Sequence, residues 1–274
     1  MSDDQGWDFR DPAGRDRLLR VLRREIDDMF ELAAAPERWN MPTACAGWQL
    51  RDMIGHLLDA TESYLAGIDF ARNGGAPPKP VGLAGMAQAF DAAARAFRST
   101  PRDELLARLR DTTDQVTNEF ESMSDADWSG LIIPDRYMDP LPAKFVAAGM
   151  LGGSVVHAWD VREGIGAPHA IAGDAADLLV PFVYLLWWAT ADTSSVDAPY
   201  AVGIRTTGHN GGDTRFDVSR EGLQFAATEI DACGAILELD PATLVLTAYN
   251  RINAGTVRGD QRLVTAFRSL FVAI

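Results

Sequence analysis

The sequence is poor in several features that mark familiar classes of protein. Cys45 and Cys233 are the only cysteines among 274 residues. Two thiols this far apart make neither a disulfide framework nor a cysteine-rich zinc site. Residues 1–10 contain no apolar run of the signal-peptide kind. From these absences we expect a cytoplasmic protein with reduced cysteines.

Positive charge and long apolar runs are also scarce. The chain has 39 acidic and 25 basic residues, a formal net charge of −14. A surface this negative repels phosphate groups, so we expect neither a nucleic acid nor an anionic membrane as a partner. The longest apolar run, 178–191, is shorter than the roughly 20 residues that span a bilayer. Hydrophobic residues still make up 47% of the chain, which is enough for a packed core.

Apolar residues in the first half recur at three- and four-residue spacing, which predicts helices. Proline and glycine clusters separate these segments. Several antiparallel helices with short connections are typical of a four-helix bundle. The predicted helices cover residues 16–35, a segment from 50 to beyond 65, and residues 83–98, 102–122 and 143–164.

The second half changes character. One more helix is predicted at 175–190, followed by strands at 200–206, 214–218, 222–228 and 235–239. Asp240-Pro241 and Gly259-Asp260 each begin a further helix. The pattern predicts a small α+β domain with a mostly antiparallel sheet. We therefore expect a helical bundle over residues 1–170 and an α+β domain over residues 171–274.

Two of the four histidines lie centrally on predicted bundle helices. His56 and His157 each have apolar neighbours, so each is either a hydrogen-bonded core residue or one half of a shared site. Bundle cores are where facing helices bring metal ligands together, and imidazole is a common ligand. His169 and His209 lie in loops, where we expect exposed or loop-stabilising roles.

Other residues with chemical potential are few. Cys45 precedes a helix start, where a thiol can be reactive, but we interpret it as a small buried residue beneath the Trp48 ring. Glycines 149, 152 and 153 interrupt the helix at 143–164 and indicate close approach of a neighbouring helix or a ligand. The sequence contains no glycine-rich phosphate loop, nucleophile elbow or His-Glu-x-x-His motif.

Three segments of the sequence carry a resemblance to a known family. The first segment is Pro42-Thr43-x-Cys45-x-Gly47-Trp48-x-Leu50-x-Asp52-Met53-x-x-His56-Leu57. It resembles the N-terminal signature of the mycothiol-dependent maleylpyruvate isomerase family, which belongs to the wider DinB-like group of bundles. The second segment, around His157-Ala158-Trp159-Asp160, is similar to the family's His-x-Trp-Asp helix, and the third, from 237 to 260, is similar to its sterol-carrier-like α+β domain.

The resemblance implies a divalent metal, zinc by preference, in the bundle. His56 and His157 match two of the family's ligands, but the Glu expected four residues before His157 is Gly153. Water, substrate, or a nearby carboxylate such as Asp160 or Asp52 would have to replace it. We interpret both aspartates as hydrogen-bonding partners that support the site. The resemblance also implies that Arg251, on the second domain, assists the reaction.

These features favour an enzyme, a thiol-dependent isomerase or transferase that acts on a small electrophilic molecule. Mycothiol or another low-molecular-weight thiol would be its co-substrate, and the metal site would lack the usual glutamate. One alternative is a metal-independent enzyme of specialised metabolism that uses His56 or His157 as acid or base. Trp48, Tyr64, Gly153 and Trp159 would line its substrate pocket. The other alternative is a non-catalytic binding protein for an apolar ligand.

Overall fold

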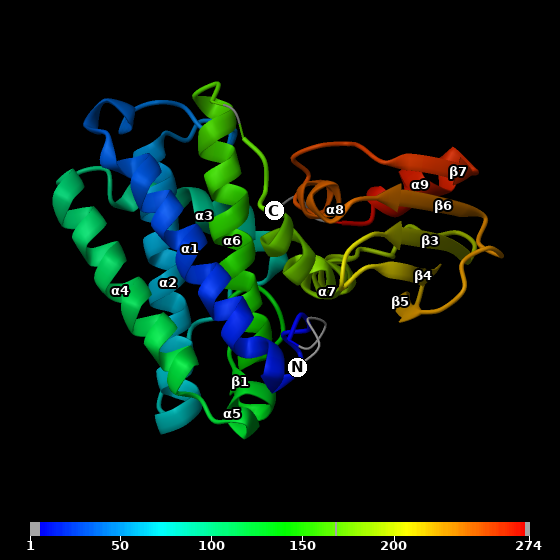
Figure 1. The fold of residues 1–274 in the computed structure, drawn as a ribbon, viewed down its shortest axis with the longest axis horizontal. Coiled ribbons are helices and arrows are strands. Elements are labelled where there is room, and N and C mark those ends of the chain that lie inside the picture. The colour runs from blue at the N-terminus through cyan, green and yellow to red at the C-terminus, as the bar shows by residue number, and fades with distance from the viewer. Residues whose placement is uncertain (1–5, 168, 272–274) are drawn as a thin grey trace. The chain divides into compact units, whose positions relative to one another are not determined.

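Helices make up the first part of the chain, and a five-stranded sheet dominates the second (Figure 1). The computed structural model describes residues 6–167 and 169–271, and the chain divides into two units, 1–171 and 172–274. The first unit contains the 3-10 helices η1 (Pro12–Gly14) and η2 (Pro36–Arg38), the helices α1 (Arg15–Ala34), α2 (Leu50–Asn73), α3 (Leu83–Ala96), α4 (Arg102–Ser122), α5 (Asp125–Gly130) and α6 (Ala143–Gly164), and the short strands β1 (Ile132–Ile133) and β2 (Leu141–Pro142).

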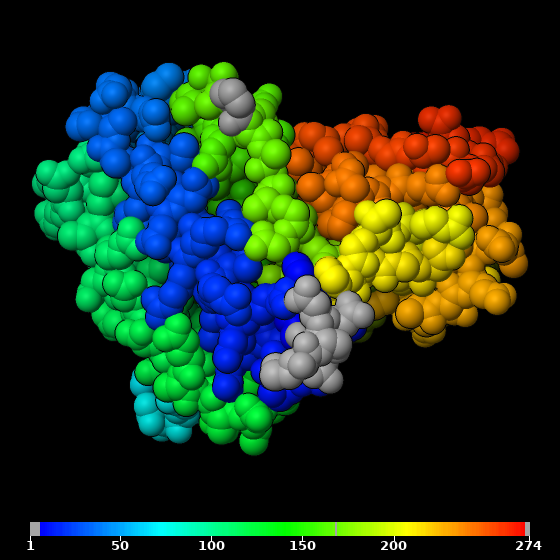
Figure 2. All heavy atoms as spheres, in the orientation of Figure 1, coloured from blue at the N-terminus to red at the C-terminus, as the bar shows by residue number. Residues whose placement is uncertain are grey.

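Four long helices of the first unit share one hydrophobic core. α1 packs against α6, and α2 packs against α3 and α4. On the face shown in Figure 2, atoms of α1 (blue) lie against those of α4 (blue-green). Burial of this apolar surface is what stabilises helices of this length in water. The core side chains are Met29, Leu32, Ala33, Leu50, Met53, Ile54, Leu58, Leu105, Leu109, Ala158 and Val161.

Helix α6 carries the closest backbone contact with the loop that precedes α2. A Cβ atom at Gly164 would overlap the carbonyl oxygen of Pro42 and the Cα of Thr43. At Gly153, in contrast, a Cβ atom would meet no described atom within 4 Å. Of the two alternatives, close approach of a neighbouring helix or of a ligand, the described part of the structure shows no neighbouring helix at the Gly153 Cβ position, and the ligand alternative stays a prediction.

The second unit has helices and a mixed sheet in the order β5-β4-β3-β6-β7. β3 and β6 pair in parallel, and the other neighbouring strands pair antiparallel. Asp240 and Asp260 cap α8 and α9 by accepting hydrogen bonds from backbone amides. The elements are α7 (Gly173–Thr190), β3 (Tyr200–Thr206), β4 (Gly212–Ser219), β5 (Gly222–Ala227), β6 (Ala235–Leu239), α8 (Pro241–Ala248), β7 (Thr256–Gly259) and α9 (Gln261–Arg268).

An aromatic cluster forms the core of the second unit. The Trp187 ring of α7 lies 5.8 Å from the Phe216 ring of β4 and 5.4 Å from the Phe267 ring of α9. Phe216 and Phe267 are themselves 5.2 Å apart, centroid to centroid. Edge-on aromatic pairs of this kind add to the stabilisation that buried area provides. Among residues 6–167 and 169–271, no helix combines the length and the apolar character needed to cross a membrane.

The predicted fold class, a helical region followed by an α+β region, is confirmed. The helices α4 and α6 begin and end at the predicted residues. The sequence did not predict α5, β1, β2 or β7, which are two to six residues long. Segments this short carry too few residues for a hydrophobic period to stand out.

Two substitutions on α6 test the close approach of the loop. We expect Gly164→Ala to lower the free energy of unfolding by about 2 kcal/mol or more, because its Cβ has to displace backbone atoms of the loop. Gly153→Ala is the matched control and should leave stability unchanged or raise it by up to about 1 kcal/mol. Urea unfolding of both variants measures this, and equal effects would contradict the packing described here.

Candidate functional site

The imidazoles of His56 and His157 come together inside the helical unit. Their ring centroids are 5.0 Å apart and their planes nearly perpendicular, at 89°. His56 projects from the second turn of α2 and is 6% exposed, and the His157 side chain, from the second half of α6, is 13% exposed. Two distant parts of the sequence therefore contribute to one partly accessible imidazole pair.

Aromatic rings surround His56. The Trp48 ring lies 5.2 Å from the His56 ring, and the Phe90 ring of α3 lies 4.7 Å from it on a T-shaped contact. Tyr137 extends the row, 4.8 Å from Phe90. The indole nitrogen of Trp48 donates a hydrogen bond to Asp91 over 3.1 Å, which fixes the indole ring. Phe90 and Tyr137 were not predicted as site residues, although the apolar period of α3 marks Phe90 as inward-facing.

Asp160 connects the loop that carries Cys45 to the His157 imidazole on α6. Its side chain is fully buried, and its Oδ2 lies 2.9 Å from Nδ1 of His157 and 3.2 Å from Sγ of Cys45. Its backbone oxygen accepts a hydrogen bond from the amide of Ala44 over 2.8 Å. An ionised carboxylate only accepts hydrogen bonds, so with Asp160 ionised Nδ1 of His157 carries a proton, and in the neutral imidazole Nε2 then holds the lone pair.

The loop before α2 holds the Cys45 thiol in place. The two ends of this loop pair through an isolated β-bridge between Pro42 and Gln49. Inside it, the amide of Trp48 donates to the carbonyl of Cys45 over 3.0 Å, and Gly47 adopts the left-handed φ of +79° that favours glycine. Cys45 is half-buried and packs against the hydrophobic core, in line with our interpretation of it as a small buried residue. Its contact with Asp160 was not predicted, because Asp160 lies 115 positions away.

Asp52 has a structural role at the start of α2. Its carboxylate accepts hydrogen bonds from Arg98 over 2.7 and 2.8 Å and from the amide of Gln49 over 2.9 Å. Burial by itself raises the pKa of Asp52, but the hydrogen bonds and positive charge of Arg98 outweigh burial and hold that pKa below its usual value. Asp52 thus anchors α3 to the helix that carries His56.

Three further predicted site residues, Trp159, Tyr64 and Arg251, are described by their own contacts and burial. The Trp159 ring packs 4.9 Å from His169, whose Nδ1 lies 2.8 Å from the carbonyl oxygen of Ala167, so His169 stabilises its loop. Tyr64 is half-buried, two turns beyond His56 on α2. Arg251 belongs to the second unit, where its Nη1 donates to a backbone oxygen over 2.7 Å. The functional roles of Tyr64, Trp159 and Arg251 stay predictions.

The family's ligand set does not fit this chain. Gly153 offers no donor atom, and the position of its missing side chain meets no described atom within 4 Å. A different group can hold a metal ion: the ligand atoms of Cys45, His157 and Asp160 all lie within 4.8 Å of one another. His56 is outside that group, so its predicted role as a ligand stays a prediction.

Comparison with known proteins gives a consistent result. Residues 19–162 match the sequence model of the mycothiol maleylpyruvate isomerase N-terminal domain. A crystal structure of the mycothiol-dependent maleylpyruvate isomerase is 13% identical, with a TM-score of 0.57, over 89% of this chain and 92% of that chain. A mutant of that enzyme is 12% identical over the same shares, with a TM-score of 0.56. At such identities the likeness shows the fold alone. A search of curated proteins gives no significant match.

The ion pair between the buried Asp52 carboxylate and the partly exposed Arg98 guanidinium predicts a pH-dependent stability difference. Because the pKa of Asp52 is lower in the folded state, its contribution is complete above about pH 4 and disappears as the pH falls through the folded-state value. We expect Asp52→Asn to lower the free energy of unfolding at neutral pH by about 1–3 kcal/mol.

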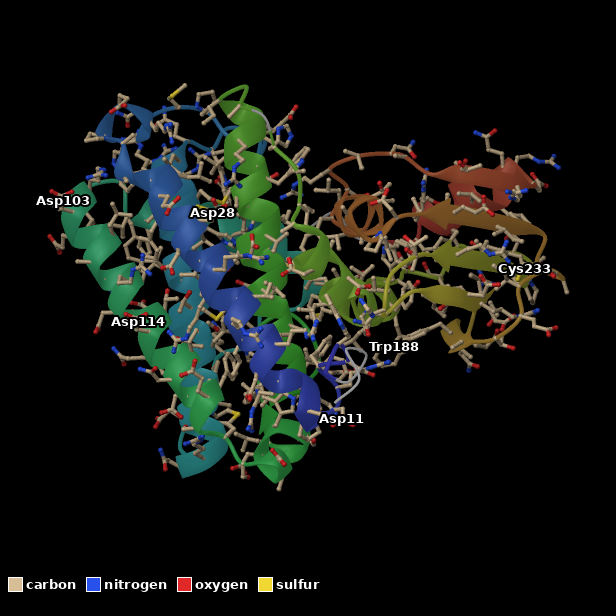
Figure 3. All side chains as sticks on the ribbon, viewed as in Figure 1. Asp11, Asp28, Asp103, Asp114, Trp188 and Cys233 are labelled. Carbon is tan, nitrogen blue, oxygen red and sulfur yellow. The ribbon has the colours of Figure 1, made fainter. Side chains whose placement is uncertain are left out.

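The difference between the wild type and Asp52→Asn should shrink in acid, as measured by denaturant unfolding at a series of pH values. Asp114→Asn is the control, since Asp114 is exposed on α4 (Figure 3). A difference between wild type and Asp52→Asn that stays constant as the pH is lowered would show that Asp52 is not ionised in the folded protein.

Proposed function

The chain belongs to the mycothiol maleylpyruvate isomerase family, and on this premise we propose that it is a thiol-dependent isomerase or thiol transferase for small electrophiles. The observation that carries the proposal is the imidazole pair, 5.0 Å apart and partly accessible, beside the Cys45 thiol and the Asp160 carboxylate. Two imidazoles and a carboxylate, which can accept protons, therefore lie next to a thiol in the core of the helical unit. Mycothiol or a similar low-molecular-weight thiol is the proposed co-substrate.

In the proposed reaction, His56 accepts the proton of the incoming thiol. The thiolate sulfur then bonds to one carbon of an activated double bond, and the π electrons move to the conjugated carbonyl oxygen. Rotation about the new single bond, followed by loss of the thiolate, gives the isomer. In the transferase version, the proton returns to the substrate carbon and the thioether is released. Imidazole suits this shuttle because it binds and releases protons near neutral pH.

The surrounding residues prepare His56 and His157 for these roles. The rings of Trp48 and Phe90 hold the His56 imidazole between them and keep bulk water away from it. Asp160 fixes the His157 tautomer, so that Nε2 presents a lone pair to whatever binds there. The open space at Gly153, one turn before His157 on the same helix, gives a substrate room beside the pair.

Removal of the His56 imidazole tests the proton-shuttle role. We expect His56→Ala to lower kcat/KM by about 100- to 10,000-fold, the usual contribution of a general acid–base group. The assay uses maleylpyruvate as the probe substrate with a low-molecular-weight thiol present or omitted, and thermal unfolding checks that the fold is retained. His169→Ala is the matched control in the same unit and should keep nearly full activity. Equal activity of His56→Ala and the wild type would refute the role.

A second candidate function follows from the open space at Gly153. Without the family's glutamate, the chain could act without a metal or a thiol on a bulkier substrate, with the His157–Asp160 pair as its base. The two candidates differ in one observable. Turnover that is independent of added thiol favours this second function, and turnover that requires thiol favours the first.

Gly153→Glu probes the space itself. The new side chain would occupy the volume beside His157, so we expect KM to rise or turnover to be lost, while the fold persists because a Cβ there meets no described atom within 4 Å. Gly153→Ala fills much less of that space and should keep most of the activity. Unaltered kinetics in Gly153→Glu would mean that no substrate uses this space.

A further inference from the structure

Three different kinds of metal-binding atom meet at the site. The thiol of Cys45, the imidazole of His157 and the carboxylate of Asp160 offer sulfur, nitrogen and oxygen atoms that all lie within 4.8 Å of one another. Each is at least half-buried, and the Asp160 side chain is fully buried. A mixed sulfur, nitrogen and oxygen donor set suits zinc and similar transition metals, whereas magnesium and calcium prefer oxygen alone.

Charge explains why these three groups could replace the missing glutamate. Two neutral histidines bring no negative charge to a divalent ion, and Gly153 brings none either. A Cys45 thiolate and the Asp160 carboxylate bring two, which balances a 2+ ion in a buried place where uncompensated charge is costly. A metal ion would displace the thiol proton of the hydrogen bond from Sγ to Oδ2, at 3.2 Å, and the His157 proton would move from Nδ1, 2.9 Å from Oδ2, to Nε2, so that Nδ1 becomes the ligand.

The backbone already holds the three groups together. Asp160 accepts a hydrogen bond from the amide of Ala44 through its backbone oxygen and one from the neighbouring Cys45 thiol through its side chain. Gly164 lets the same loop lie directly against α6. His157 and Asp160 are three residues apart and share a helix face. Little conformational entropy remains to be lost when a ligand binds to such a preorganised site.

We propose that this chain binds one divalent metal ion of the zinc type through Cys45, His157 and Asp160, a ligand set different from the His, Glu and His set that the family resemblance implies. The site takes three protein ligands and leaves a coordination position for a small molecule. The site lies beside the His56 ring. Metal binding itself does not rest on the proposed function, but the role of the metal in a reaction does.

Cobalt titration of the full-length protein tests the ligand set directly. Protein treated with chelator and kept reduced is titrated with Co²⁺, and the near-ultraviolet spectrum is recorded. The proposal predicts one equivalent of bound Co²⁺, an intense sulfur-to-cobalt charge-transfer band, and displacement by one equivalent of Zn²⁺. Cys45→Ser should lose the band and bind the metal more than about 100-fold more weakly, since loss of even an outer hydrogen-bonding partner costs about 10- to 100-fold.

Cys233→Ser is the matched control, because Cys233 is the other cysteine and lies in the second unit (Figure 3). It should keep the band and the affinity. A measurement on the wild type alone avoids any folding defect of a variant: Zn²⁺ should protect Cys45 from alkylation, as located by peptide mass spectrometry. Stoichiometric binding without the band, or alkylation of Cys45 unaffected by Zn²⁺, would overturn the ligand set, and absence of binding would overturn the site.

The two proposals at this site fail in different ways. Metal binding is read by spectrum, stoichiometry and protection, none of which needs a substrate. Loss of thiol-dependent turnover in every assay, with the charge-transfer band intact, would reject the proposed function and leave the metal site standing. Thiol-dependent turnover in a protein that binds no metal would reject the metal site and leave the function standing.

Discussion

The candidate site depends on one buried carboxylate. The Asp160 carboxylate accepts hydrogen bonds from the Cys45 thiol and the His157 imidazole, and the backbone oxygen of the same residue accepts one from the Ala44 amide, so Asp160 joins the loop before α2 to helix α6. A buried charge is tolerated only when such partners surround it. The hydrogen bonds that offset the cost of burying the Asp160 charge also set the His157 tautomer and hold the Cys45 thiol near the His157 ring. Stability and chemical arrangement therefore have a common origin here.

Two glycines on α6 delimit the arrangement. Gly164 has no room for a side chain, because the loop backbone occupies that place, and this contact lets Cys45 approach Asp160. Gly153 stands where the family resemblance implies a glutamate, and the space beside it is open. The missing side chain at Gly164 allows the loop to pack against α6. The missing side chain at Gly153 leaves open space where the family resemblance implies a carboxylate. The chain thus keeps the family's fold without the glutamate that the resemblance implies.

Much of this could be predicted from the sequence, and the reasons for the exceptions are physical. The long amphipathic segments predicted the long helices. The positions of His56 and His157 on two such helices predicted that their imidazoles could meet, because the helices of a bundle face a common core. The short elements α5, β1, β2 and β7 carry too little periodic pattern to be found. The contact between Cys45 and Asp160 was not predicted because the two residues are distant in sequence, and propensity or spacing holds no information about such a contact. Phe90 contacts His56 only through the packing of α3 on α2.

The position of one proton tests the central claim most directly. Long-range ¹⁵N–¹H correlation spectra of the metal-free protein, labelled at histidine, distinguish the two neutral tautomers of His157. If Asp160 organises the site as described, the proton lies on Nδ1 and the lone pair on Nε2, and Asp160→Asn abolishes this preference. A proton on Nε2 in the wild type would mean that the carboxylate does not hold the imidazole, and the account of the site would fail.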